Sequence, residues 1–178
     1  ARAFAEGWLG STEKQAVFFR SKIQPDSYKL AFEPNKSYKG SGALTLFDLE
    51  KGDEDFGTGK WLGFQDTPFE IQMDFKSPQT IENIAFSTLA AEGSHIFPPS
   101  KVEVWIKTQN ADWKLVDTQK PEQPTGNRDR LLQMYESKIN QNGILAIKAK
   151  LSPVNPLPKW HPGAGGKGWV FVDEILIN

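Results

Sequence analysis

The chain has 178 residues, enough for one domain with its own hydrophobic core and a short appendage, and it leaves little room for two full domains. Its 21 basic and 22 acidic residues nearly cancel, so no chain-wide charge favours nucleic acid or an anionic membrane as a partner. The absence of cysteine excludes disulfides, thiolate zinc sites and cysteine nucleophiles.

The predicted elements are almost all strands. Residues 1–24 are predicted to be an appendage of two short strands, the second at residues 16–19, ahead of a main domain at residues 25–178. In the main domain the pattern predicts strands at residues 69–75, 81–89, 101–108, 114–117, 143–150 and 168–177. Residues 129–138 fit an irregular strand or a helix equally well. No apolar run approaches the roughly 18 residues of a membrane-spanning helix, so no membrane span is expected.

Three connecting segments have an unusual composition. Residues 39–63 are rich in glycine and acidic residues, residues 91–100 contain His95 and two adjacent prolines, and residues 152–167 combine proline and glycine with Trp160 and His161. Long loops on a compact scaffold often carry function. Together with 6 tryptophans and 12 phenylalanines, they favour a β-sandwich with functional loops.

Four segments, taken in this order and spacing, resemble one known family. They are YKGSGALTLFDLEKGDEDFGTGKWLGF (38–64), SHIFPPSKVEVWIKTQNADWKLV (94–116), WHPGAGGKGW (160–169) and VFVDEILI (170–177). From about residue 25 onward the chain resembles the discoidin-like domain (coagulation-factor C-type, galactose-binding-like) of secreted bacterial glycosidases, especially the chitobiase-associated kind. The first residues resemble the last strands of the fibronectin-like domain that precedes such modules. The resemblance implies an all-β fold, an antiparallel jelly-roll β-sandwich of about eight strands.

The chain departs from the family pattern at two turns. The family's Asp-Gly is Asp48-Leu49 here, and its Ser-x-Asp-Gly is replaced by TQNAD at residues 108–112. Glycine at such places usually adopts a positive φ, which other residues rarely do. Without it, the sequence does not predict the backbone geometry of the two turns.

A calcium ion is the first predicted ligand. The acidic loop DLEKGDEDF offers Asp48, Asp53 and Asp55 together with backbone carbonyls, and hard cations bind such oxygen-rich loops. The loop lacks the spacing of an EF-hand. The family resemblance implies a structural ion held by Asp48, Asp53 and Glu174. The alternative is a solvated acidic turn that binds nothing tightly.

A sugar is the second predicted ligand. Pyranose rings have an apolar face and a rim of hydroxyls, so their sites combine an aromatic platform with a few polar side chains. In the resembled fold, loops at one end of the sandwich form the ligand face. The predicted carbohydrate-binding residues are Trp160, His161, His95 and Phe97, with Lys159 and Lys167 as hydroxyl donors.

Each aromatic residue also has a structural interpretation. Trp105 and Trp113 are predicted to pack in or near the core, and Trp61 and Trp169 flank strands and are expected to pack as well. For Trp160 and His161, which lie between Pro158 and Pro162, the functional and the structural interpretations are equally open.

No catalytic constellation stands out in the sequence. Asp173 and Glu174 are adjacent on a predicted strand and would point to opposite faces, so they are not expected to form an acid/base pair. Neither histidine lies near a nucleophile motif, and the glycines of GAGGKGW do not match a phosphate-binding loop. The chain is therefore expected to be no enzyme in its own right.

The sequence thus predicts a non-catalytic carbohydrate-binding module that holds a larger secreted multidomain protein on glycans. Its expected partners are a glycan or polysaccharide and the neighbouring domains of the parent protein, and its expected location is secreted, periplasmic or at the cell surface. The alternatives are a protein-interaction or adhesion module and a structural spacer on the same fold, because a fold does not dictate function.

Overall fold

The structure is a computed structural model that describes residues 2–7, 9–11 and 20–178. Its regular elements are seven strands and two 3-10 helices: β1 Ser27–Leu30, η1 Gly42–Leu46, β2 Leu62–Phe64, β3 Phe69–Ala90, η2 Glu92–Ser94, β4 Lys101–Thr108, β5 Lys114–Gln119, β6 Leu131–Ser152 and β7 Val170–Ile177. No helix among the described residues is long and apolar enough to cross a membrane.

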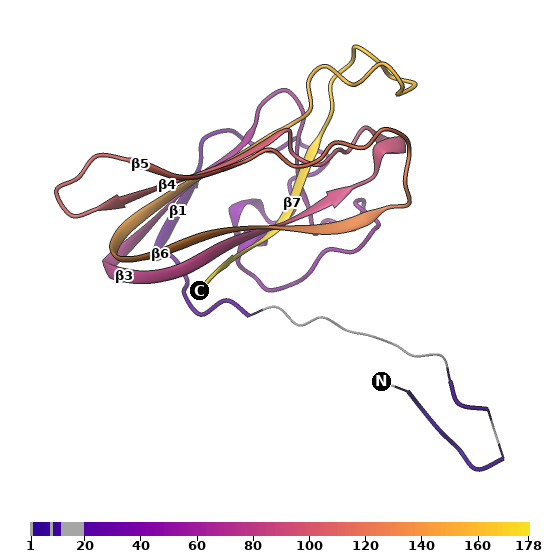
Figure 1. Cartoon of the computed structure of the whole chain (residues 1–178), viewed down its shortest axis with the longest axis horizontal. Coiled ribbons are helices and arrows are strands. Elements are labelled where there is room, and N and C mark those ends of the chain that lie inside the picture. Colours follow the sequence, from indigo (N-terminus) through magenta and orange to yellow (C-terminus); the bar gives the residue numbers. More distant parts are fainter. Residues whose placement is uncertain (1, 8, 12–19) are drawn as a thin grey trace.

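Two long, bent strands build both layers of the sandwich (Figure 1). The strand order is β2-β7-β3-β6-β4-β5, and β1 pairs with β3. β3 and β6 pair along their whole length, but the register shifts between Asp74 and Asn83, and Gly143 has a positive φ of 77° on the facing stretch of β6. On one side of this bend β3 pairs with β1, and on the other side it pairs with β7. All ladders between the named strands are antiparallel, and the predicted antiparallel β-sandwich is confirmed.

The strand predictions were correct in type but not in number. The predicted strands at residues 69–75 and 81–89 are the two halves of β3. Residues 131–138, for which the sequence fitted a strand or a helix equally well, form a strand as part of β6. The missed strands β1 and β2 have only 4 and 3 residues, too short for a clear alternating pattern.

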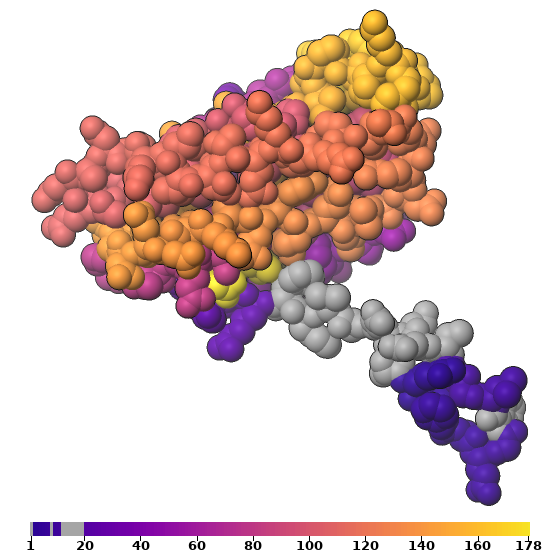
Figure 2. Space-filling view, viewed as in Figure 1, coloured from indigo at the N-terminus to yellow at the C-terminus, as the bar shows by residue number. Residues whose placement is uncertain are grey.

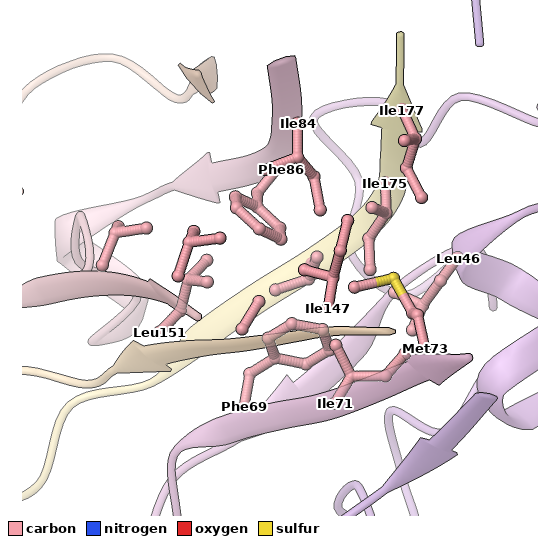
Figure 3. Close-up of a cluster of buried hydrophobic side chains, with 14 of the residues drawn as sticks. Leu46, Phe69, Ile71, Met73, Ile84, Phe86, Ile147, Leu151, Ile175 and Ile177 are labelled. Carbon is pink, nitrogen blue, oxygen red and sulfur yellow. The ribbon is translucent and has the colours of Figure 1, made fainter. Parts of the chain in front are cut away.

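The main core lies between the two layers. The alternating residues Phe69, Ile71 and Met73 of β3 are fully buried, while Gln72 between them is exposed. They meet Ile147 of β6 and Ile175 of β7 from the facing strands (Figure 3). Each such side chain contributes about 1.5–3 kcal/mol by leaving water, so the core carries most of the fold's stability.

The chain enters the sandwich beside its last strand. The backbone N–H groups of Lys22 and Ile23 both donate to the Ile177 carbonyl, at 2.9 and 3.1 Å. The end of the predicted appendage is therefore tied to β7. The predicted strand at residues 16–19 lies outside the described residues, and the division of the chain at residue 24 stays a prediction.

Long loops gather at one end of the molecule. The segment between β6 and β7 projects from that end, away from the turn between β4 and β5 at the other end (Figure 1). In Figure 2 it forms a protruding lobe at the yellow end of the colour scale. This end carries the residues that the sequence predicted to bind sugar.

Candidate functional site: the loop end and the acidic loop

Hydrogen bonds join three loops into one surface. Between residues 91–99 and the last loop, the Trp169 N–H donates to the His95 carbonyl at 2.8 Å, and the Phe97 N–H donates to the Trp169 carbonyl at 3.2 Å. From the loop between β5 and β6, the Gln123 amide donates to the Pro99 carbonyl at 3.1 Å. The three segments are far apart in the sequence, so the surface exists only in the folded chain.

Four predicted residues come together on this surface. The ring centroids of His95 and His161 are 4.8 Å apart, those of Phe97 and His161 5.5 Å, and those of Trp160 and His161 5.5 Å. Phe97 is 1% exposed and His161 is 3% exposed, whereas Trp160 and His95 are partly exposed. The two buried rings therefore form a floor under Trp160.

Both ring nitrogens of His161 are used inside the protein. Its Nδ1 accepts a hydrogen bond from the Gly163 N–H at 2.9 Å, so Nε2 of the neutral ring carries the hydrogen and donates to the Glu92 carbonyl at 2.8 Å. This side chain holds two loops together. A side chain on Gly163 would displace the His95 ring, because an added Cβ would lie 2.5 Å from its Nε2, so glycine here allows the close packing of these loops.

Sequence reasoning missed an ion pair beside this cluster. Glu92 is fully buried, and its carboxylate accepts hydrogen bonds from Nε of Arg128 at 3.0 Å, from Nη2 of Arg128 and from the Arg128 N–H at 3.3 Å. The Arg128 side chain is 41% exposed. Arg128 is thus a donor held rigidly at the surface, and only the fold brings these residues, 36 positions apart, into contact.

A polar hollow of about 400 Å³ lies next to Arg128. Its lining includes Gln123, Pro124, Gln133 and Tyr135. Oε1 of Gln123 is buried and accepts no hydrogen bond. The Tyr135 hydroxyl donates to Gln133 at 2.9 Å, and burial raises the pKa of Tyr135 to about 12 against the opposing charge of Arg128, so the hydroxyl stays protonated. Polar side chains, several of them fixed by hydrogen bonds, therefore line this hollow.

Trp160 connects the aromatic cluster to the hollow. Its indole N–H donates to the carbonyl of Pro124, a lining residue, at 3.1 Å. Lys159, beside Trp160, is exposed. Lys167 lies on the far arm of the same loop, where its ammonium pairs with Asp66. The fold thus gathers the predicted aromatic residues, while Lys167 is engaged elsewhere.

Packing explains the tryptophans that flank strands. Trp61 is fully buried, and its indole N–H donates to the Asp53 carbonyl at 3.1 Å. Trp169 packs edge-on against Tyr38 and Phe171, with ring centroids 5.4 and 5.8 Å apart. The predicted packing roles of both tryptophans are confirmed.

The three residues predicted to hold a metal lie in different environments. Glu174 is buried, and both its carboxylate oxygens lack a hydrogen-bond partner. The Asp48 carboxyl group is one of the groups that raise the Glu174 pKa. Asp53 is exposed and caps its own turn by accepting the Asp55 N–H at 2.9 Å. Within residues 2–7, 9–11 and 20–178, no three acidic, histidine or cysteine side chains form a ready-made metal cluster.

An ion pair between Lys51 and the buried Asp173 anchors the acidic loop to β7. Nζ of Lys51 lies 2.9 Å from Oδ2 of Asp173, which is fully buried and also accepts the Gly52 N–H at 2.7 Å. The same ammonium donates to the Ser87 hydroxyl. Lys51 of the acidic loop thus supplies the positive charge that faces the Asp173 carboxylate.

β7 has an irregularity at this point. Between Ser87 and Thr88 of β3 the register with β7 shifts, so Glu174 and Val172 face consecutive residues and Asp173 is extra. The strict alternation expected for Asp173 and Glu174 does not hold at such a bulge. Both carboxyl groups are nevertheless buried, which keeps them from flanking a bond of a bound substrate.

The pH dependence of stability should report on Glu174. Burial and the carboxyl groups of Asp48 and Asp173 raise the pKa of Glu174 from 4.5 to about 8, although Lys51 lowers it. The folded chain therefore binds this proton more tightly than the unfolded chain, and the free energy of unfolding should fall as pH rises from 4.5 to about 8. The Glu174→Gln variant should show a flatter profile in urea denaturation with chelator present. Parallel profiles for the two proteins would contradict this prediction.

Comparison with known proteins identifies the fold. No family model and no curated protein matches the sequence. The chain is similar to the solved module CpGH89CBM32-4 of Clostridium perfringens, in complex with GlcNAc-α-1,4-galactose, at a TM-score of 0.53 and 10% identity over 94% of this chain and all of that chain. This chain shares the fold of that module. The C-terminal domain of a Bacteroides fragilis chitobiase is also similar, with a TM-score of 0.48 and 17% identity over 88% of this chain and 95% of that chain.

Both departures from the discoidin-like pattern keep a positive φ. Leu49, where the family pattern has glycine, has a φ of 62°, and Asn110 in the β4–β5 turn has a φ of 58°. Asparagine tolerates this region well, but a leucine there is strained by its Cβ. The chain therefore stores backbone strain in the loop that the Lys51–Asp173 pair anchors.

Proposed function

We propose that this chain is a non-catalytic carbohydrate-binding module whose site lies at the loop end of the sandwich. The observation that carries the proposal is the partly exposed Trp160 ring beside the hollow lined by Arg128, Gln123 and Tyr135. An aromatic platform next to a few fixed polar groups matches the two faces of a pyranose. The named sugar in a structural neighbour of the same fold supports the same class of ligand.

In this proposal each group has a distinct task. The apolar face of the sugar stacks on Trp160, and the Arg128 guanidinium donates to ring hydroxyls. The Gln123 and Tyr135 side chains form part of the polar lining beside it. Phe97 and His161 support the platform from below. A shallow site of this kind buries only part of a ligand, so we expect weak binding of a single sugar.

The module would act by tethering. Weak binding of a glycan raises the local substrate concentration for a catalytic or anchoring domain joined to it, and no chemistry is needed. We propose that the parent is a larger secreted, periplasmic or cell-surface protein. No catalytic role is proposed for the buried Asp173 and Glu174 carboxyl groups.

A glycan array tests this function. The isolated chain is applied to amino sugars, galactosides and plant polysaccharides, with and without calcium. We expect binding to a subset of these glycans that free sugar of the same type inhibits. Silence across the array would overturn the proposal and favour a protein-interaction or spacer module.

We further propose a structural calcium ion at the acidic loop. Asp48 and Glu174 would bind it together with backbone carbonyls of the loop, and the two unpartnered oxygens of Glu174 fit a cation that displaces the carboxyl proton, because the carboxylate is then an acceptor only. Asp53 would act by shaping the loop through the Asp55 N–H and the Trp61 indole. The ion would hold the acidic loop against β7.

Thermal unfolding in calcium and in chelator tests this site. Calcium should raise the melting temperature of the wild-type protein, since a ligand that binds only the folded state stabilises it. The Glu174→Gln variant should lose that gain, whereas Glu54→Gln, on the same loop but outside the proposed site, should keep it. Equal melting temperatures in calcium and chelator would count against the ion.

A further inference from the structure

A buried glutamate connects the three loops that meet at the loop end. Glu92, the first residue of η2, is fully buried. Its carbonyl accepts hydrogen bonds from the His95 N–H and from Nε2 of His161, both at 2.8 Å. Its carboxylate accepts hydrogen bonds from the side chain and from the backbone of Arg128. Glu92 therefore joins the aromatic cluster through its backbone and the polar hollow through its side chain.

The carboxylate of Glu92 fixes the orientation of the Arg128 guanidinium. Nε and Nη2 of Arg128 both donate to Oε1 of Glu92, and the Arg128 N–H donates to Oε2 at 3.3 Å. An arginine side chain has five N–H donors in one plane, so Glu92 uses two of them and leaves the others for a ligand. Arg128 lines the polar hollow and its side chain is 41% exposed, so a sugar in the hollow can reach these donors.

Stability alone does not explain this ion pair. Removing a carboxylate from water is costly, and its attraction to a cation does little more than offset that cost, so apolar residues in place of both partners are often equally stable. Among the described residues Arg128 forms the only ion pair of Glu92. The pair also leaves the guanidinium partly exposed, where an apolar contact would be buried. Its clearest consequence is therefore the fixed orientation of Arg128.

We propose that Glu92 is a positioning residue for sugar binding at the loop end: it orients Arg128 relative to Trp160. This role rests on the proposed function and adds to it a residue that touches no sugar, because Glu92 is fully buried. A guanidinium without this support has to be ordered when the sugar binds, and that loss of freedom weakens binding. The Glu92 carbonyl also holds His161, whose ring lies 5.5 Å from that of Trp160, so one residue links the platform to the donor.

A double-mutant cycle in glycan affinity tests this role. The probe is the glycan that gives the strongest wild-type signal on the array, titrated by calorimetry. Glu92→Gln keeps the shape of the side chain but loses its charge, and it should weaken binding about tenfold. Arg128→Gln should weaken binding by at least as much. The double variant should bind no more weakly than Arg128→Gln alone, because Glu92 acts only through Arg128, whereas a merely structural role would make the two losses multiply.

Two further variants complete the cycle. Asp129→Asn removes an exposed charge next to Arg128 in the chain, is the matched control and should leave binding unchanged. Arg128→Lys keeps a positive charge opposite Glu92 but loses the planar fork, so it should weaken binding in a folded protein even where Glu92→Gln does not fold. Wild-type affinity in Arg128→Lys would overturn the proposal.

An NMR signal reports the orientation of Arg128 without any sugar. The Arg128 Nε–H donates to Glu92 at 3.0 Å, so its proton should exchange slowly with water and give a sharp signal at neutral pH. Glu92→Gln should broaden this signal, and Asp129→Asn should keep it. An unchanged signal and affinity in Glu92→Gln, or losses that multiply in the double variant, would overturn the positioning role and leave the proposed function standing. A wild-type chain that binds no glycan on the array would overturn both.

Discussion

Replacing Lys51 with methionine should lower the free energy of unfolding by about 3–5 kcal/mol, the usual cost of removing one partner of a buried ion pair. Asp173 is fully buried, and among the described residues Lys51 forms its only ion pair, at 2.9 Å. Without the ammonium, the carboxylate keeps only the Gly52 N–H at 2.7 Å. Urea denaturation at neutral pH measures the loss.

Two further variants test the cause of this loss. Adding Asp173→Asn to the Lys51→Met variant should recover much of the stability, because no uncompensated charge is then buried. Lys22→Met breaks an exposed pair with Glu82, whose side chains are 50% and 65% exposed, and should cost less than about 1 kcal/mol. Equal losses for Lys51→Met and Lys22→Met, or no recovery in the double variant, would contradict the buried-pair explanation.

Replacing Trp160 with alanine should weaken binding of any glycan identified on the array by at least about 30-fold, or about 2 kcal/mol, the loss typical of a dominant aromatic contact. The ring joins the polar hollow through Pro124 and rests on Phe97, with ring centroids 5.8 Å apart. Without the ring the sugar has no surface to stack on, and it is no longer held against the polar groups of the hollow. Isothermal titration with the array-selected glycan measures the effect.

The control for this variant separates binding from stability. Trp160→Phe keeps an aromatic face but loses the hydrogen bond to Pro124, so it should retain most of the binding. Urea denaturation of both variants should show a loss of stability too small to unfold either at the assay temperature. If Trp160→Ala binds as the wild type does and is strongly destabilised instead, the residue is structural and the site lies elsewhere.

The alternation of residues predicted the strands well, because a period of two is a local property that sequence displays directly. The same alternation predicts that Trp105, which is partly exposed, faces outward, since Val104 and Ile106 on either side of it are buried. We expected Trp105 in or near the core because it lies on the same strand as Val102, but an odd position between two buried residues belongs to the opposite face. The alternation within a strand therefore decides burial, and membership of a core strand does not.

The loops were predicted as functional on composition, and the fold gathers Trp160, His161, His95 and Phe97 into one cluster. Composition did not reveal that Phe97 and His161 would be buried. It also did not point to Arg128, whose position depends on a carboxylate 36 residues away. Polar residues are common in loops, so residue type alone does not predict which of them meet in the folded chain.

The sequence by itself therefore determined the all-β class, the main strands and the loops that carry aromatic residues, because these follow from local periodicity and composition. Only the tertiary structure decided which charges meet. Lys51 and Asp173 are 122 residues apart and Glu92 and Arg128 are 36 apart, and each pair forms because strands bring its loops to one end or one edge of the sandwich. Long-range pairing depends on how the layers close, and no short stretch of sequence encodes that geometry.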